Sequence, residues 1–192
     1  MIARTHDVAA ATALLAVVLA QPPHSVTLAT AVAALVANQI GGIAPDIDQP
    51  TAPFWRNLPI GGIFGKIIGR SLGGHRFLSH SLLGLALFGF VNYWLLNFLH
   101  PIMPRIDIGL VWWAFMIGML SHLVMDSLSK EGVPWLLPIP IKFGFPPLRR
   151  LRITTGKKAE HFIVLPLLLA VAVWLFASNY TEITAYVDQF RR

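Results

Sequence analysis

The stretch from Ile108 to Ser127 constrains the fold most, because its twenty residues are mainly apolar and include no Lys, Arg or Glu. A helix of about 20 apolar residues is long enough to cross a bilayer. The stretch nevertheless holds His122 and Asp126, which are four residues apart and therefore share one face of a helix. Ionisable groups are costly inside a membrane and usually face the protein interior. We expect a spanning helix whose polar pair either joins it to a neighbouring helix or belongs to a functional site.

The composition of the whole chain indicates an integral membrane protein. Of the 192 residues, 55% are hydrophobic and only 12% are charged, whereas about 25% of the residues in a typical soluble domain are charged. The chain has no cysteine, which excludes disulfide bonds and thiolate metal ligands. We predict an all-α polytopic membrane helix bundle, a single domain over residues 1–192, with spanning helices at about 6–20, 25–44, 80–99, 108–127 and 160–177. A cleaved signal peptide is the alternative for the first of these segments.

Two long loops, 45–79 and 127–158, join the predicted spans. A short helix at Ile60–Ile68 is expected to lie at the membrane surface, and the proline-broken run Val133–Pro140 to rest in the interface. Twelve of the fifteen Lys and Arg residues lie in these loops and the N-terminal segment. Because basic loops stay in the cytoplasm, we predict that the N-terminus and both loops are cytoplasmic. The net charge of +6 then reflects topology and attraction to anionic lipid, not nucleic-acid binding.

This topology brings polar side chains from every predicted helix to one membrane face. They are His6, Asp46, Asp48, His75, His80, His122, Asp126 and Glu160. A single histidine in a membrane protein usually donates a hydrogen bond between helices, but agreement among five helices favours a metal site. Imidazole and carboxylate ligands without sulfur suit zinc, manganese or iron. We predict one to three divalent ions, with His6, Asp46, His80, His122 and Asp126 as ligands and Asp48 and His75 as ligands or orienting partners.

Clustered metal ions suit hydrolysis of phosphate esters, because they activate water and stabilise the attacking and leaving oxygens. Arg76 is predicted either to clamp a phosphate, since guanidinium binds phosphate oxygens in pairs, or to anchor the chain to lipid headgroups. Glu160 is predicted to be a ligand or a general acid/base. Asp48 joins Glu160 and Arg76 among the candidate catalytic residues.

A series of short motifs resembles one known family. In order along the chain they are Thr5-His6, Pro45–Pro50, His75–Ser81, Leu120–Asp126, Gly132-Val133-Pro134, Gly156 and Glu160. The series is similar to the YdjM-like family of bacterial inner-membrane proteins, which are described as membrane-bound metal-dependent hydrolases, and it covers roughly residues 1–165. The chain departs from the pattern at Gln49, where a histidine is expected, and at Phe77, where a glycine is expected.

The family in turn resembles, more distantly, the zinc-dependent phospholipase C and nuclease superfamily of all-α enzymes with a three-metal cluster. The likeness is carried by an early His, an Asp on a loop, a following His and a His-x-x-x-Asp helix: His6, Asp46, His80, His122 and Asp126. A His-x-x-x-Glu partner helix is not evident, so one or two metal ions are at least as well supported as three.

We therefore expect a membrane-bound hydrolase that cleaves a phosphoester at the cytoplasmic face, with a membrane lipid as the substrate or partner. Two other classes stay open. A metal or proton transporter would hold its ligands near the bilayer midplane between inverted repeats. A non-catalytic scaffold would have a closed coordination shell around a structural metal. The sequence leaves the oligomeric state open.

Overall fold

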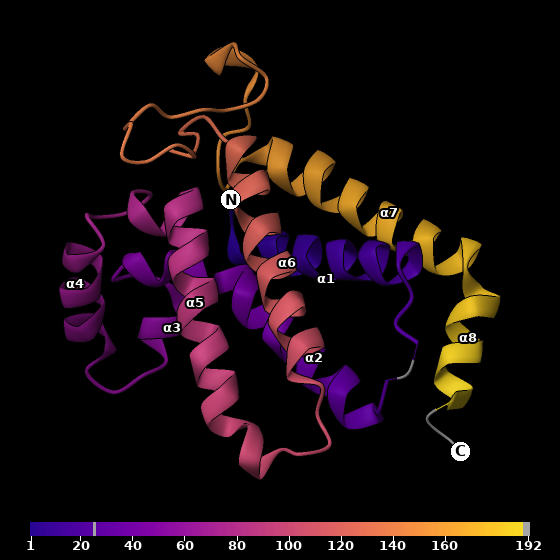
Figure 1. Ribbon diagram of the computed structural model, residues 1–192. Coiled ribbons are helices and arrows are strands. Elements are labelled where there is room, and N and C mark those ends of the chain that lie inside the picture. The colour runs from indigo at the N-terminus through magenta and orange to yellow at the C-terminus, as the bar shows by residue number, and fades with distance from the viewer. Residues whose placement is uncertain (25, 190–192) are drawn as a thin grey trace.

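The computed structural model describes residues 1–24 and 26–189, and within them the regular structure is helical (Figure 1). Ser25, the predicted start of the second span, and the Arg191–Arg192 pair lie outside the described residues. The longer helices are α1 (Ala3–Ala20), α2 (Leu28–Ile43), α5 (Leu82–Leu99), α6 (Ile108–Ser127) and α7 (Leu165–Ser178). The shorter elements are η1 (Ala44–Asp48), α3 (Pro53–Arg56), α4 (Gly61–Ser71), η2 (Leu78–His80), η3 (His100–Ile102), η4 (Arg149–Leu151), η5 (Glu160–Val164) and α8 (Tyr180–Gln189).

Five helical segments among the described residues are long and apolar enough to cross a membrane, which confirms the predicted fold class. They are Ala3–Ala20, Leu28–Asp48, Leu82–Ile102, Ile108–Ser127 and Glu160–Ser178. The expected surface helix at Ile60–Ile68 corresponds to α4.

Two predicted helix boundaries differ from the structure. The first helix begins at Ala3 rather than at residue 6, so Thr5 is buried within its first turn. The second helix ends at Ile43, one residue before the predicted end at 44, and continues directly into η1. Gly41, within this helix, allows close packing, because a Cβ at this position would overlap the Phe115 carbonyl of α6.

Helix α6 forms the centre of the bundle, where it packs against α1, α2 and α5 (Figure 1). Its crossing with α2 is very close, because glycines on both helices let the backbones approach. A Cβ at Gly118 would overlap the Asn38 carbonyl, and the Asn38 amide donates to the Ala114 carbonyl at 3.0 Å. The buried apolar cluster next to this crossing consists of Phe115, Met119, Leu123 and Val133.

Gly118→Ala is expected to destabilise the protein, because the added methyl group must push α2 away from α6. Overpacking of this kind typically costs about 1–3 kcal/mol. The measurement is the thermal unfolding temperature in detergent, with Gly62→Ala as the control, since a Cβ at Gly62 meets no described atom within 4 Å. Equal unfolding temperatures for the two variants would contradict the close crossing.

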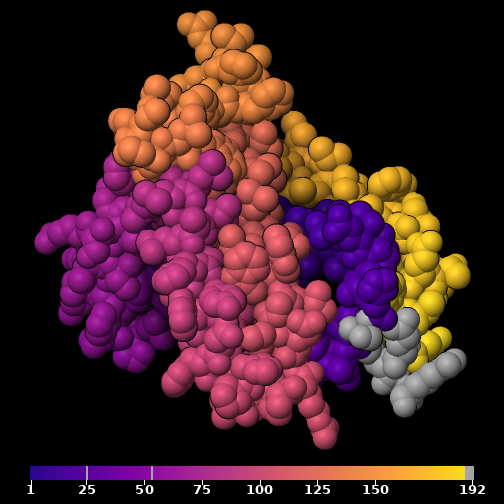
Figure 2. All heavy atoms as spheres, in the orientation of Figure 1, coloured from indigo at the N-terminus to yellow at the C-terminus, as the bar shows by residue number. Residues whose placement is uncertain are grey.

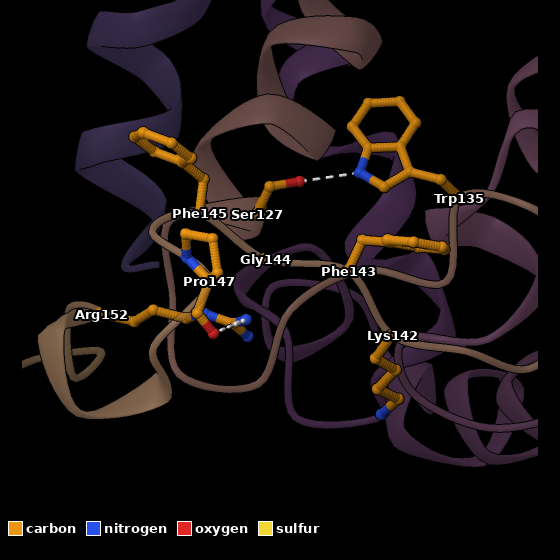
Figure 3. Close-up of a pocket in the computed structure, with 8 residues that line it drawn as sticks. All are labelled: Ser127, Trp135, Lys142, Phe143, Gly144, Phe145, Pro147 and Arg152. Carbon is orange, nitrogen blue, oxygen red and sulfur yellow. Dashed lines mark hydrogen bonds between the residues drawn. The ribbon is translucent and has the colours of Figure 1, made fainter.

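The 127–158 loop covers the end of α6 beside the segment that precedes α5 (Figure 2). Its described backbone is largely irregular, with isolated bridges pairing Ser129 with Ile153 and Val133 with Phe143. The Trp135 indole donates to the Ser127 hydroxyl at 2.9 Å, which fixes the loop to α6 (Figure 3). A shallow pocket of about 430 Å³ lies here, lined by Ser127, Trp135, Lys142, Phe143, Gly144, Phe145, Pro147 and Arg152.

Candidate metal centre

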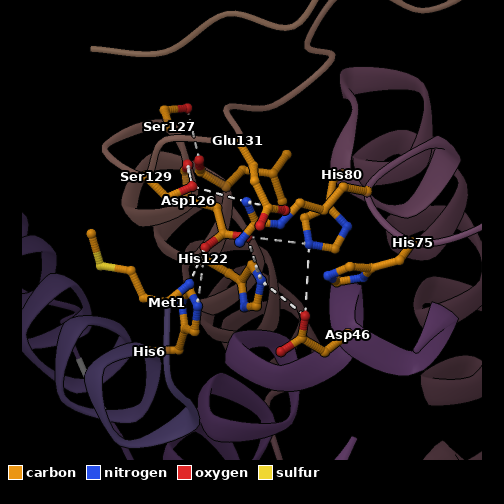
Figure 4. Close-up of polar contacts among 12 residues, drawn as sticks. Met1, His6, Asp46, His75, His80, His122, Asp126, Ser127, Ser129 and Glu131 are labelled. Atoms are coloured by element: carbon orange, nitrogen blue, oxygen red, sulfur yellow. Dashed lines mark hydrogen bonds and ion pairs between the residues drawn. The ribbon is translucent and has the colours of Figure 1, made fainter. Parts of the chain in front are cut away.

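Four segments far apart in the sequence bring the predicted ligands together at one end of the bundle (Figure 4). His6 lies at the end of the first turn of α1, and Asp46 lies in η1, which prolongs α2. His75 and His80 lie in the link between α4 and α5. His122 and Asp126 project from the last turns of α6.

The first group of candidate ligands is His6, His122 and Asp126, whose ligand atoms lie within 4.8 Å of one another. The His6 and His122 rings stack with their centroids 3.6 Å apart, and His6 Nε2 lies 3.4 Å from Asp126 Oδ1. His122 Nδ1 lies 2.6 Å from the Gly42 carbonyl oxygen. A carbonyl only accepts, so Nδ1 carries the proton and the lone pair of the neutral ring is on Nε2.

The second group is Asp46, His75 and His80, whose ligand atoms also lie within 4.8 Å of one another. Carboxylates connect the two groups. Asp46 Oδ1 lies 3.7 Å from His80 Nε2 and 3.6 Å from His122 Nε2. Asp126 Oδ2 lies 3.5 Å from His80 Nε2 and 3.8 Å from His122 Nε2. All six side chains therefore form one cluster with two overlapping sets of ligand atoms.

The cluster fits a divalent cation because buried imidazole nitrogens point into it without hydrogen bonds. His80 Nε2, His122 Nε2 and both ring nitrogens of His6 lack a hydrogen-bond partner among the described residues. Buried polar atoms are nearly always paired, and an unpaired one costs free energy. Neutral imidazole nitrogens beside carboxylate oxygens are the ligands that zinc and related ions prefer. A bound cation would satisfy these atoms together.

Asp48 lies beside the cluster and orients its members. Its carboxylate accepts hydrogen bonds from the Arg76 backbone N–H at 2.9 Å and from the Ser79 hydroxyl. It also lies 2.8 Å from His75 Nδ1 and 3.3 Å from His80 Nδ1. Metal-bound histidines usually hold a carboxylate or carbonyl through the other ring nitrogen, which fixes the ring. This geometry fits Asp48 as an orienting partner of both histidines.

His80 lies just outside the membrane-spanning segments, and its surroundings shift its pKa. Burial lowers its pKa, but the interactions with Asp126 and Asp48 outweigh burial, and the pKa is raised above its usual value. Protons therefore compete with a cation for His80 Nε2, since a metal ligand must be the neutral ring.

Arg76 turns inward to the cluster from a backbone with φ of 58°. Its Nη2 lies 2.7 Å from Asp126 Oδ2, and its Nη1 lies 3.2 Å from Glu131 and donates to the Ser129 hydroxyl at 2.9 Å. The amino group of Met1 also forms an ion pair with Asp126. The structure thus places Arg76 against a candidate ligand and in the protein interior, not at a headgroup-facing surface.

Ser129 and Glu131 were not predicted from the sequence. Both follow Asp126 at short spacing in the turn after α6, where the chain reverses towards Arg76. The spacing alone gave no reason to select them, because Ser and Glu are common in exposed turns.

Glu160 lies outside both groups of candidate ligands. Its carboxylate is fully buried and accepts hydrogen bonds from the backbone N–H groups of Ile2, at 2.7 Å, and Gly156, at 2.6 Å. Both oxygens therefore accept from backbone donors, one just before α1 and one in the loop that precedes η5. This arrangement fits a residue that fixes the helix carrying His6, and its predicted catalytic role stays a prediction.

Glu160→Gln is expected to lower the free energy of unfolding by about 1–3 kcal/mol, because the amide NH2 replaces one acceptor and faces a buried N–H donor. The folded variant should keep the wild-type metal content. Thermal unfolding and metal analysis measure the two effects, with Glu182→Gln on the exposed side of α8 as the control. Full stability combined with lost hydrolysis would instead support a catalytic Glu160.

Comparisons with known proteins agree with these motifs. The chain is 28% identical over 137 residues to the uncharacterized protein YvsG of Bacillus subtilis (strain 168), which covers 71% of this chain and 74% of YvsG. No solved structure matches the chain. The model of the family described as YdjM inner membrane protein matches residues 1–183. The chain therefore belongs to the YdjM inner membrane protein family.

Proposed function

We propose that this membrane protein is a metal-dependent hydrolase that cleaves a phosphoester of a lipid or another membrane-associated substrate. The observation that carries the proposal is the convergence of six histidine and aspartate side chains, with buried imidazole nitrogens that have no partner among the described residues. The two overlapping sets of ligand atoms favour two ions over one. Zinc fits the ligand chemistry best, and manganese or iron is the alternative.

The roles of the side chains follow from their contacts. His6, His122 and Asp126 would hold one ion, and Asp46, His75 and His80 the other. A bound pair of such ions supplies water of lowered pKa and neutralises charge on phosphoryl oxygens. Asp48 keeps the rings of His75 and His80 in place. Arg76 holds Asp126 through one guanidinium nitrogen and stands close enough to the cluster to meet a phosphate.

The position and openness of the cluster support catalysis over the two other classes. The ligands occupy the ends of α1, α2 and α6, whereas a transporter site is expected near the midplane. The side chains of Asp46 and His75 are 27% and 35% exposed, so one side of the cluster faces the surface. A structural metal would have a closed shell. The exposed side is where a substrate would enter.

The charge distribution supports a cytoplasmic location for this end of the bundle. Twelve of the fifteen Lys and Arg residues belong to the N-terminal segment and to the 45–79 and 127–158 loops, all of which adjoin the cluster. Basic segments flanking spans stay on the cytoplasmic side. The proposed substrate is then a lipid of the cytoplasmic leaflet of the bacterial inner membrane.

The test combines metal analysis with an assay of phosphate release from anionic phospholipid in nanodiscs. We expect bound zinc, manganese or iron, loss of hydrolysis after chelation and recovery when the ion is restored. His122→Ala should lose both metal and activity. His24→Ala is the matched control, because His24 is exposed and lies between α1 and α2, beyond the end of α1 that is away from His6. Unchanged turnover after complete removal of metal would exclude this function.

A further inference from the structure

Helix α4 (Gly61–Ser71) divides into three lengthwise stripes. Gly61, Gly65 and Gly69 form the buried stripe. Apolar side chains form a second stripe that is between 48% and 67% exposed, and it consists of Ile60, Ile63, Phe64 and Ile67. The exposed cations Lys66 and Arg70 are four residues apart and form a third stripe. The molecule therefore leaves both an apolar and a basic face of α4 uncovered within its described residues.

The glycine stripe seats α4 directly on the backbone beneath it. A Cβ at Gly61 would overlap the carbonyl of Trp55, and one at Gly65 would lie 2.9 Å from Pro50 Cα. A Cβ at Gly69 would overlap the carbonyl of Asp48. Only glycine permits such contact between two backbones. Helix α4 thus rests on the residue whose carboxylate orients His75 and His80.

The place of α4 in the chain puts it at the membrane surface. It lies at the outer edge of the molecule beside α3 and α5 (Figure 1). It connects α2 to α5, and residues near the ends of both helices meet in the metal centre. Eleven residues are too few to span a bilayer, which needs about 20. Exposed apolar residues beside cations on a short helix are typical of helices that lie in the headgroup boundary.

We propose that α4 lies flat in the interface of an anionic bilayer and couples that lipid surface to the metal centre. Ile60, Ile63, Phe64 and Ile67 enter the acyl boundary, while Lys66 and Arg70 bind headgroup phosphates. The cations and the anionic headgroups are complementary in charge. This lipid contact fixes α4, and α4 in turn fixes the backbone of Asp48.

The docking step is tested by the depth of single nitroxide labels, for which the absence of cysteine makes each introduced thiol unique. Ile67→Cys labels the apolar stripe, and Gly62→Cys labels a position where a Cβ meets no described atom within 4 Å. The protein is placed in nanodiscs of phosphatidylcholine or of an equal mixture with phosphatidylglycerol. In the mixed nanodiscs we expect the label at 67 to collide several-fold more with oxygen than with an aqueous nickel chelate, and the label at 62 to show the reverse.

Two results would overturn the docking step. Equal exposure of both labels to the nickel chelate would place α4 in water. Dipolar broadening between labels at 67 of different molecules would show that a second copy of the chain covers this stripe.

The role of the cations is tested by Lys66→Glu combined with Arg70→Glu. In the wild type we expect oxygen collisions of the label at 67 to be several-fold more frequent in the mixed nanodiscs than in nanodiscs of phosphatidylcholine alone. The double variant should lose this increase. Arg105→Glu, an exposed change in the turn before α6 at the opposite end of the bundle, is the control and should retain the increase. An unchanged response in the double variant would overturn the headgroup contact.

The coupling step rests on the proposed metal centre and has its own readout. Gly69→Ala should displace Asp48 and weaken zinc affinity about tenfold, as loss of an orienting partner does, whereas Gly62→Ala should leave affinity unchanged. Circular dichroism and the label at 67 check that Gly69→Ala remains folded and docked. Equal zinc affinity of the two variants would overturn the coupling. Failure of the wild type to bind any metal would overturn the coupling and the proposed function, while the label depths still decide the docking.

Discussion

Asp126→Asn is expected to lose metal binding and, with it, hydrolysis. Asp126 lies within 4 Å of the ring nitrogens of His6, His80 and His122, so it reaches histidines of both candidate groups, as Asp46 also does. Asparagine offers one neutral oxygen and turns an NH2 donor towards the buried guanidinium of Arg76, which also donates. Loss of the metal's charge stabilisation, roughly 4 kcal/mol, corresponds to a rate reduction of about 10³-fold.

The matched control for this prediction is Asp107→Asn at the other end of the same helix. Asp107 caps α6 by accepting hydrogen bonds from the backbone N–H groups of Gly109 and Leu110, and asparagine caps helices equally well. Metal content and phosphate release are measured on both purified variants, together with their unfolding temperatures. If folded Asp126→Asn retained wild-type metal content and turnover, the cluster would not be the catalytic centre.

The spanning helices were predictable because the membrane imposes a simple rule on sequence. Long, mainly apolar runs such as Ile108–Ser127 are expected to be helical, since every backbone polar group has to be paired inside lipid. Alternation of the spans then determines which helix ends share a side. This is why His6, Asp46, His80 and His122, spread over more than half of the chain, were expected to meet.

Finer distinctions within the site depended on local backbone geometry. Asp46 and Asp48 look equivalent in the sequence, but a 3₁₀ segment has three residues per turn, so positions two apart point in different directions. Asp46 consequently faces the Nε2 atom of His80, and Asp48 faces the Nδ1 atom of the same ring. Arg76 faces inward and has a positive φ, a backbone conformation that its residue type gives no reason to expect.

Glu160 illustrates a second reason why the role of a site residue could not be predicted from the sequence. Its position at the start of the last span is the one expected for a metal ligand. Its carboxylate nevertheless accepts hydrogen bonds from the backbone N–H groups of Ile2 and Gly156. These partners depend on how α1 packs against the loop before α7. Packing of this kind produces no periodic pattern of residues from which it could be predicted. The glycine stripe of α4 could not be recognised from the sequence either, because glycine is used both in turns and at close backbone contacts.

Loading the metal centre is expected to raise the thermal unfolding temperature by roughly 10 °C. A ligand present at about 1,000 times its dissociation constant stabilises the folded state by about 4 kcal/mol, and each kcal/mol shifts the unfolding temperature by about 2–4 °C in a chain of this size. The physical reason is that ring nitrogens of His6, His80 and His122 without a partner in the described part of the chain are buried at a cost that a cation removes.

The measurement compares unfolding with excess zinc and with chelator for the wild type, His122→Ala and His24→Ala. The wild type and His24→Ala should show the full shift, because His24 lies in an exposed turn away from the cluster. His122→Ala should unfold at one temperature in both conditions, since it loses the Nε2 that faces Asp46 and Asp126. A wild-type protein insensitive to zinc and chelator would mean that the histidines and aspartates only join the helices to one another, and that the hydrolase proposal is wrong.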